Sequence, residues 1–298
     1  MVRPAHFGYN PETAENNAFQ SSIGSEDIGK IKSRAEREFD DLVDKMRNAG
    51  IDVWVHEDTR QVVKPDAIFP NNWFTTHDDG SLITYPMFSP VRRLERDPVI
   101  IEKLKTEFAV SNRIVLEDYE SDNKFLEGTG SLILDRKNKK AYACISQRTH
   151  PAILQDFSEK FGYEVISFKA VDPKGIPVYH TNVIMTLGAG FAILCVECIT
   201  DEADRKKVRS KLDAAGLELV EISFEQVLQF AGNMLQMIND KGDPVLAMSS
   251  SAFRSLTAEQ KSTLRKYTEI LHSDIPTIEK FGGGSVRCMI AENFLPAR

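Results

Sequence analysis

The strongest constraint on the fold is a segment that recurs five times along the chain. The five copies read FPNNWFTTHDDGSLITYPMF from Phe69, FLEGTGSLILDRKNKKAYACIS from Phe125, VYHTNVIMTLGAGFAILCVECI from Val178, FAGNMLQMINDKGDPVLAMSS from Phe230 and FGGGSVRCMIAENF from Phe281. Each opens with a turn rich in small or amide-bearing residues. The first four continue as an apolar strand, a Gly- or Asp-containing turn and a second apolar strand, which is the pattern of a β-hairpin. The fifth copy is shorter.

The copies are evenly spaced. Their equivalent turn positions are Asn72, Gly130, Asn182, Asn233 and Ser285, which lie 58, 52, 51 and 52 residues apart. A nearly constant period of this size indicates repeated supersecondary units, such as the blades of a propeller.

The sequence between the hairpins repeats as well. Helical patterns precede the hairpins at Ile28–Ala49, Asp97–Phe108, Pro151–Phe161, Asp201–Ala215 and Thr257–Leu271. Short strand patterns follow them at Asp52–His56, Arg113–Glu117, Tyr163–Phe168, Leu217–Ile222 and Thr277–Lys280. We therefore expect an α/β fold, a five-bladed β/α propeller that takes up residues 1–298 as a single domain. The alternative is a generic α/β protein whose repeats are coincidental.

Composition narrows the function classes. The 298 residues carry 37 Lys and Arg against 44 Asp and Glu, a net charge of −7 that argues against nucleic acid or an anionic membrane as partner. No apolar run approaches the roughly 20 residues of a membrane span. The first ten residues lack the pattern of a signal peptide, and four cysteines are too few for a disulfide framework. We expect a cytoplasmic protein.

The repeated turns are where chemistry is expected, since the blades of a propeller bring equivalent turns to its central channel. They carry Glu127, His180 and Cys288 from three distant segments. A thiol, an imidazole and a carboxylate form the usual set for covalent catalysis: the thiolate attacks, the imidazole moves protons, and the carboxylate orients a substrate or a base. Taken singly, each has a structural alternative: a core cysteine, a hydrogen-bonded histidine and a solvated turn carboxylate.

Other residues at the turns are candidates for substrate binding: Asn71, Asn72, Asn182, Asn233 and Gly283. The glycine run 282–284 lets the backbone approach a ligand closely and exposes its N–H groups. Cys195 and Cys198 have metal-type spacing, but they lie in an apolar strand without a second pair, which favours core packing. We expect no metal and no organic cofactor.

The motifs FPNNWF, LEGTG, YHTN and GGGSVRCM resemble the guanidino-group-modifying (pentein) superfamily, which comprises arginine and agmatine deiminases, dimethylarginine hydrolases and amidinotransferases. The resemblance covers the whole chain and implies the five-bladed propeller fold. It also implies that Cys288 is the nucleophile, His180 the general acid/base and Glu127 a ligand to substrate nitrogens. The opening residues RPAHFGYN and TAENNAFQ are similar to the branch of citrulline-utilisation hydrolases, or citrulline ureidases.

The chain departs from the deiminase pattern at two positions. Deiminases typically have an aspartate where this chain has Asn72 and another where it has Asn182. Paired carboxylates suit a guanidinium cation, but they cannot donate to the C=O of a neutral ureido group. An asparagine both donates and accepts, so the two differences favour a ureido substrate.

The expected reaction is hydrolysis of citrulline to ornithine, ammonia and carbon dioxide through a Cys288 adduct. The alternatives are a guanidine hydrolase, an amidinotransferase and, more distantly, a non-catalytic binding protein of the same fold. The partner is a small ureido or guanidino amino acid, and a homo-oligomer is compatible with the sequence. Candidate ligands of its carboxylate are Arg92, Arg93, Arg148 and Arg287. Amides placed near the channel mouth are Asn10, Asn16, Asn17 and Gln20.

Overall fold

The computed structural model describes residues 1–15, 17, 19–22, 24 and 26–298. Within these residues the chain forms four three-stranded sheets of one design, in which an antiparallel hairpin is joined by a third, parallel strand. The sheets are β3 (Phe74–Thr76), β4 (Ser81–Thr84) and β5 (Asn112–Val115); β6 (Ile133–Asp135), β7 (Lys140–Cys144) and β8 (Glu164–Phe168); β9 (Met185–Gly188), β10 (Phe191–Leu194) and β11 (Glu218–Glu221); β12 (Leu235–Ile238), β13 (Pro244–Ser249) and β14 (Glu269–Ser273). The four predicted hairpins are confirmed.

A helix connects the second and third strands of each sheet, as a parallel connection requires. These helices are α4 (Pro98–Glu107), α6 (Pro151–Phe161), α7 (Glu202–Ala214) and α10 (Ala258–Leu264). Each begins at a side chain that accepts a hydrogen bond from a backbone N–H of the first turn: Asp97, His150, Asp201 and Thr257. Shorter helices fill the connections: α1 (Pro11–Ala14), α3 (Pro90–Arg93), η2 (Glu117–Asp122), η4 (Val196–Cys198), α8 (Phe224–Val227) and α9 (Ser250–Ser255).

The fifth unit is built differently. Its long helix α2 (Ile28–Asn48) buries an apolar stripe that includes Ile31, Phe39 and Leu42. In place of a three-stranded sheet, the described residues of this unit contain two short strands, β1 (Val2–Arg3) and β2 (His56–Glu57), which pair in parallel. The described residues after 282 contain no strand of a hairpin.

The predicted strand Thr277–Lys280 is wrong, because these residues lie in helix α11 (Pro276–Gly282). The predicted helix Thr257–Leu271 is correspondingly too long. The helix ends as α10 at Leu264, and after a short turn β14 begins at Glu269 and pairs in parallel with β13. Pairing with a buried strand outweighed the local helical pattern, and Pro276 fits the first turn of α11.

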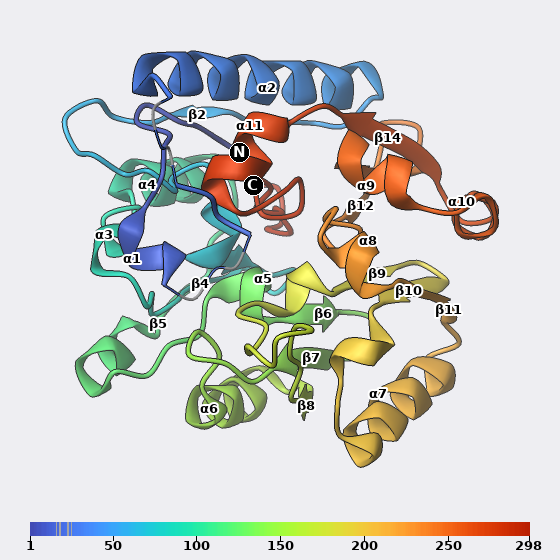
Figure 1. Ribbon diagram of the computed structural model, residues 1–298. Coiled ribbons are helices and arrows are strands. Elements are labelled where there is room, and N and C mark those ends of the chain that lie inside the picture. Colours follow the sequence, from blue (N-terminus) through green and yellow to red (C-terminus); the bar gives the residue numbers. More distant parts are fainter. Residues whose placement is uncertain (16, 18, 23, 25) are drawn as a thin grey trace.

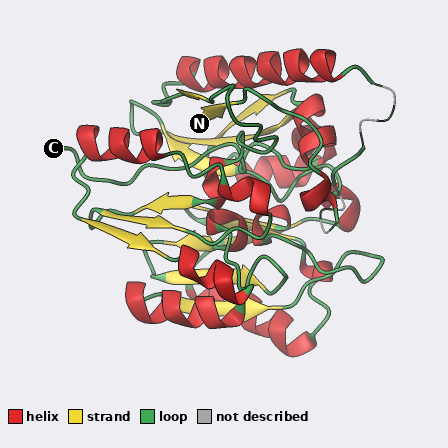
Figure 2. Cartoon of the chain, turned by 90° about the vertical axis from the view of Figure 1, so that its left-hand side faces the viewer, coloured by secondary structure: helices red, strands yellow, loops and turns green. Residues whose placement is uncertain are grey.

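The units lie around a common centre in chain order. Helices α2, α4, α6, α7 and α10 lie at the periphery, and the strands lie closer to the middle (Figure 1). The view from the side shows the strands stacked between outer helices (Figure 2). None of the described helices is both long enough and apolar enough to span a membrane.

The turns that open the first three hairpins are single helical turns: η1 (Pro70–Asn72), α5 (Gly128–Ser131) and η3 (Thr181–Val183). Successive turns are hydrogen-bonded to each other. The bonds run from Thr129 Oγ1 to the Asn71 carbonyl (3.2 Å), from Thr181 Oγ1 to the Ser131 carbonyl (2.6 Å) and from Asn233 Nδ2 to the Asn182 carbonyl (2.9 Å). Turns from distant segments therefore converge, as the repeat predicted.

We expect Gly128→Ala to lower the free energy of unfolding by about 3 kcal/mol, since the residue has φ +45° and its added Cβ would press on the Asn71 carbonyl oxygen. Gly216→Ala is the matched control: its φ is +71°, but the space around it is open, so about 1 kcal/mol is expected. Urea unfolding measures both. Equal losses would mean that the contact between turns does not constrain the fold.

Candidate active site

A pocket of about 280 Å³ opens at the converging turns. It is lined by residues from six separate parts of the chain: Thr13, Asn17, Asp66, Phe69, Asn72, Arg92, Arg148, Tyr179, His180, Gly282, Gly283, Gly284 and Cys288. The predicted residues Cys288, His180, Asn72 and Gly283 are thus brought together. Glu127, Asn71, Asn182 and Asn233 are buried and are not among the residues that line the pocket.

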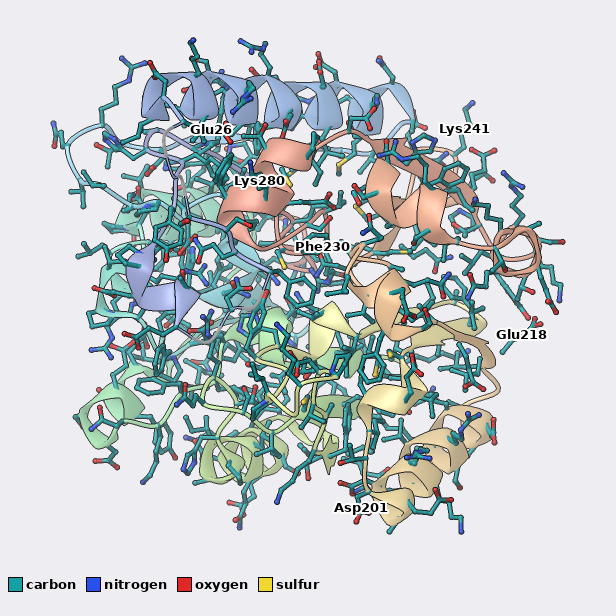
Figure 3. The ribbon with its side chains drawn as sticks, viewed as in Figure 1. Glu26, Asp201, Glu218, Phe230, Lys241 and Lys280 are labelled. Carbon is teal, nitrogen blue, oxygen red and sulfur yellow. The ribbon has the colours of Figure 1, made fainter. Side chains whose placement is uncertain are left out.

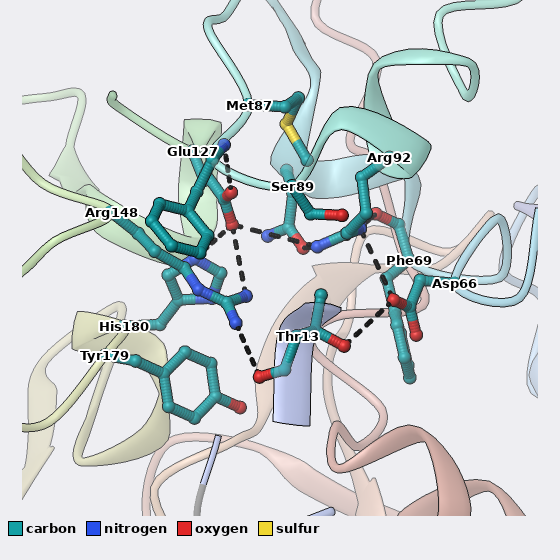
Figure 4. Close-up of polar contacts among 12 residues, drawn as sticks. Thr13, Asp66, Phe69, Met87, Ser89, Arg92, Glu127, Arg148, Tyr179 and His180 are labelled. Carbon is teal, nitrogen blue, oxygen red and sulfur yellow. Dashed lines mark hydrogen bonds and ion pairs between the residues drawn. The ribbon is translucent and has the colours of Figure 1, made fainter. Parts of the chain in front are cut away.

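Glu127 is a fully buried carboxylate surrounded by donors (Figure 4). Its Oε1 accepts from the backbone N–H of Phe88 at 2.9 Å, and its Oε2 lies 2.8 Å from His180 Nε2. The guanidinium groups of Arg148 and Arg92 lie 3.4 and 3.7 Å from Oε2. Burial by itself would raise the pKa of the carboxyl, but Arg148, His180 and Arg92 together hold it well below its usual range. Glu127 is therefore ionised.

The contact with Glu127 fixes the state of His180. An ionised carboxylate only accepts hydrogen bonds, so Nε2 of the neutral ring carries the hydrogen and Nδ1 is left as an acceptor. Burial lowers the pKa of His180 to about 4, although Glu127 opposes the shift. At neutral pH the imidazole is therefore a base able to accept a proton at Nδ1.

Gly130 makes room for this arrangement. A Cβ at position 130 would lie 2.7 Å from His180 Nδ1 and 2.5 Å from Asn72 Nδ2. The free edge of the imidazole and the amide of Asn72 therefore face the same space. This explains why the second repeat has glycine where the first and third have asparagine.

Cys288 lies in a turn after α11, in which its N–H donates to the Ser285 carbonyl at 3.0 Å. Its side chain is buried but lines the pocket. The Nδ2 atoms of Asn182 and Asn233 both lie 3.3 Å from Sγ. Two amide donors directed at sulfur favour a negative charge there, as a nucleophilic thiolate requires.

Several buried amide atoms at the site have no hydrogen-bond partner within the described residues: Asn71 Oδ1, Asn72 Nδ2, Asn182 Oδ1 and Asn233 Oδ1. Buried polar atoms are normally paired. Asn72 lines the pocket, and Asn182 and Asn233 contact the pocket residue Cys288, which indicates that a polar ligand or water completes the site.

Arg92 and Arg148 are the two predicted carboxylate ligands that line the pocket. Arg92 makes two bonds to Glu95 (2.8 and 2.9 Å) and one to Asn72 Oδ1 (2.9 Å). Arg148 donates to the Thr13 carbonyl at 3.1 Å, and its guanidinium lies over the Tyr179 ring at 4.9 Å.

The other two arginines lie elsewhere. Arg93 pairs with Glu120 at 3.3 Å, outside the pocket lining. Arg287 pairs with Glu292 at 2.9 Å and lines a second, larger cavity of about 1530 Å³. Their assignment as carboxylate ligands is not supported by this geometry.

The N-terminal segment lies against the pocket, as expected. Asn10 Nδ2 donates to Asp66 at 2.7 Å, Asn17 Nδ2 to the Gly283 carbonyl at 3.2 Å and Gln20 Nε2 to the Phe281 carbonyl at 2.9 Å. Asn16 lies outside the described residues.

Sequence reasoning missed Asp66, Thr13 and Tyr179. Asp66 is buried beside Arg92, and one of its oxygens has no partner among the described residues. Burial raises the pKa of its carboxyl. Tyr179 donates to the Gly283 carbonyl at 2.8 Å. Asp66 lies before the first repeated segment and in none of the repeated turns, so the repeat gave no signal for it.

Cys195 and Cys198 lie in the hydrophobic core, which confirms the packing interpretation. Among the described residues, no group of three or more His, Cys, Asp or Glu side chains is arranged to hold a metal ion.

A family model described as N,N dimethylarginine dimethylhydrolase, eukaryotic, matches residues 3–295 of the chain. The chain belongs to this family. It is accordingly a hydrolase of carbon–nitrogen bonds other than peptide bonds, within the guanidino-group-modifying (pentein) superfamily that the motifs indicated. The narrower citrulline branch stays a prediction.

No curated protein matches the chain by sequence. Solved structures match its fold. The apo structure of ArgZ, an arginine dihydrolase from the ornithine-ammonia cycle in cyanobacteria, has a TM-score of 0.75 and 14% identity, covering 100% of this chain and 42% of ArgZ. The N-terminal domain of ArgZ bound to product gives 0.73 and 16%, over 99% and 98%. A dimethylarginine dimethylaminohydrolase adduct with 4-chloro-2-hydroxymethylpyridine gives 0.62 and 14%, over 87% and 90%.

We expect His180 to stay neutral, with the hydrogen on Nε2, down to a pH near its pKa of about 4, because burial disfavours the cation. Nitrogen-15 NMR of histidine-labelled protein reports both the charge and the tautomer. A cation at pH 6 or a hydrogen on Nδ1 would contradict this assignment.

Proposed function

We propose that the protein hydrolyses citrulline to ornithine, ammonia and carbon dioxide, using Cys288 as the nucleophile. The observation that carries the proposal is the amide character of the site. Asn182 and Asn233 point Nδ2 at Cys288 Sγ, and Asn72, which lines the pocket, has an Nδ2 without a partner among the described residues. Amide side chains can donate to the ureido C=O and also accept from the ureido N–H groups. Ionised carboxylates can only accept.

The pocket also suits the amino-acid end of the substrate. Arg92 and Arg148 supply positive charge for an α-carboxylate. Asp66 has a buried oxygen without a partner among the described residues, which suits an α-ammonium group. A substrate held at these residues would direct its side chain towards the turns that carry Cys288 and His180.

In the proposed mechanism, His180 Nδ1 takes the proton from Cys288, and the thiolate attacks the ureido carbon. The imidazolium, stabilised by Glu127 at 2.8 Å, then protonates the side-chain nitrogen. The bond between this nitrogen and the ureido carbon breaks, ornithine leaves, and a carbamoyl group remains on sulfur. Neutral His180 next activates water, which releases carbamate, and carbamate decomposes to ammonia and carbon dioxide.

The Asn182 and Asn233 amides, whose Nδ2 atoms lie 3.3 Å from Cys288 Sγ, are the proposed donors to the charge that develops on the ureido oxygen during the attack. Donors held in place before the reaction stabilise such charge without reorganisation. Glu127 acts in this scheme by orienting the base. Its second expected role, as a ligand to substrate nitrogens, stays a prediction.

A guanidine substrate such as arginine is the second candidate. The ionised Glu127 favours it, since a carboxylate near the reacting carbon would attract a guanidinium. Similarity to an arginine dihydrolase points the same way.

In either case we take residues 1–298 as one catalytic domain, closed as a five-bladed propeller and located in the cytoplasm. Transfer to an amine and oligomer formation stay open alternatives.

Purified protein is expected to release ornithine from citrulline but not from arginine, and Cys288→Ala is expected to lower kcat by at least about 10⁴-fold because the nucleophile is lost. Cys195→Ala, which removes a core thiol, is the control and should keep most of the activity. Product chromatography measures ornithine and ammonia. Turnover of arginine alone would select the guanidine hydrolase.

Asn72→Asp is expected to lower kcat/KM for citrulline by about 10- to 100-fold, since the donor to the ureido oxygen is replaced by an acceptor. Arg92 lies 2.9 Å from Asn72 Oδ1 and would tolerate the new carboxylate. Activity with arginine should rise relative to citrulline. An unchanged ratio of the two kcat/KM values would show that Asn72 does not select the substrate.

A further inference from the structure

The helix that precedes the Cys288 turn contains an unusual buried carboxylate. Glu279 is 6% exposed, and no described residue forms an ion pair with it. Its oxygens accept instead from two serine hydroxyls, Oε1 from Ser285 at 2.7 Å and Oε2 from Ser251 at 2.8 Å. The neighbouring Lys280 faces outward and pairs with Glu26 at 2.7 Å (Figure 3).

This carboxylate lies in the core of the fifth unit, between α11 and α9, where a charge without a cation is costly. Burial raises the pKa of the Glu279 carboxyl, while the hydroxyls of Ser249, Ser285 and Ser251 oppose the shift and Glu38 adds to it. The serine hydroxyls therefore stabilise a group that packing alone would disfavour. An apolar residue would fill the same place more simply, which points to a use for the carboxylate.

Glu279 is connected to the nucleophile by two short routes. Its backbone carbonyl accepts from the N–H of Gly283 at 3.0 Å, and its side chain holds the hydroxyl of Ser285. The Ser285 carbonyl in turn accepts from the N–H of Cys288 at 3.0 Å. Glu279 thus bonds directly to Gly283 and Ser285, and Ser285 connects it to Cys288.

Asn72, Glu127 and His180 lie in or next to helical turns that lead into strands, whereas Cys288 lies in a turn without a following strand. No ladder of strand hydrogen bonds fixes its backbone. Ser285 occupies the fifth of the equivalent turn positions. In the other units a strand follows this position, whereas here the turn is held by the hydrogen bond from Ser285 to Glu279.

From this geometry we propose that Glu279 is a positioning residue, which holds Cys288 in register with Asn182 and Asn233 through Ser285. The inference rests on the proposed role of Cys288 as nucleophile. The substrate-binding arginines and Asp66 belong to other elements and do not depend on this connection. Loss of the Ser285 hydroxyl should therefore displace sulfur while leaving substrate binding in place.

The test compares Ser285→Ala with Ser251→Ala. Each removes one hydroxyl from the same carboxylate, but only Ser285 belongs to the Cys288 turn. We expect Ser285→Ala to lower kcat for citrulline by about 10- to 100-fold with KM changed by less than about twofold, since a displacement of about 1 Å of a reacting group has effects of this size. Ser251→Ala should keep both constants within about twofold of wild type.

Two further measurements accompany the kinetics. Thermal unfolding of both variants checks that any loss of stability is similar, so that it does not explain a difference in kcat. The rate of Cys288 alkylation by iodoacetamide, followed by mass spectrometry, reports the thiol without any substrate. We expect this rate to change in Ser285→Ala and to match wild type in Ser251→Ala.

The outcomes separate this inference from the proposed function. If wild-type protein does not turn over citrulline but its Cys288 is alkylated fast, the proposed substrate is wrong. The role of Glu279 is then decided by the alkylation rates of Ser285→Ala and Ser251→Ala. Equal kcat and equal alkylation in Ser285→Ala and wild type would overturn the positioning role. The same result follows if Ser251→Ala loses as much kcat as Ser285→Ala.

Discussion

Hydrogen bonds between successive turns hold the site together. Thr129, Thr181 and Asn233 each reach from one unit to the backbone of the previous one. Since the turns lie about fifty residues apart, no local interaction could bring them into contact. The same Asn233 amide that bonds to Asn182 also lies 3.3 Å from Cys288 Sγ. The Asn233 side chain therefore both connects two units and contacts the candidate nucleophile.

The buried charges depend on this convergence. Glu127 is tolerated in the interior because Arg92, Arg148 and His180 surround it. Their combined effect keeps the carboxylate ionised, and burial keeps the imidazole neutral. A neutral base beside an anion is suited to take a proton from a thiol and to hold the resulting positive charge. The interactions that allow these charged groups to be buried in the folded protein are thus the same as those that the proposed chemistry needs.

The sequence succeeded where a pattern repeats and failed where the repeat is broken. The four hairpins and the helices that begin at Asp97, His150 and Asp201 follow from periodicity and capping residues. In the fifth unit the predicted helix extended over β14, because the pairing of β14 with β13 is a tertiary contact that a local pattern does not contain. The strand predicted at Thr277–Lys280 lies in helix α11. Asp66 was missed for a related reason: it belongs to no repeated turn, and only its position beside Arg92 gives it meaning.

By itself, the sequence determined the repeated α/β units, the equivalence of their turns and the identity of Cys288, His180 and Glu127 as the candidate set. These follow from short-range patterns and from residue chemistry. The tertiary structure decided which arginines face the pocket, which amides point at sulfur and that Glu127 contacts His180. Side-chain direction and burial depend on contacts between segments far apart in the chain, and a linear pattern does not contain those contacts.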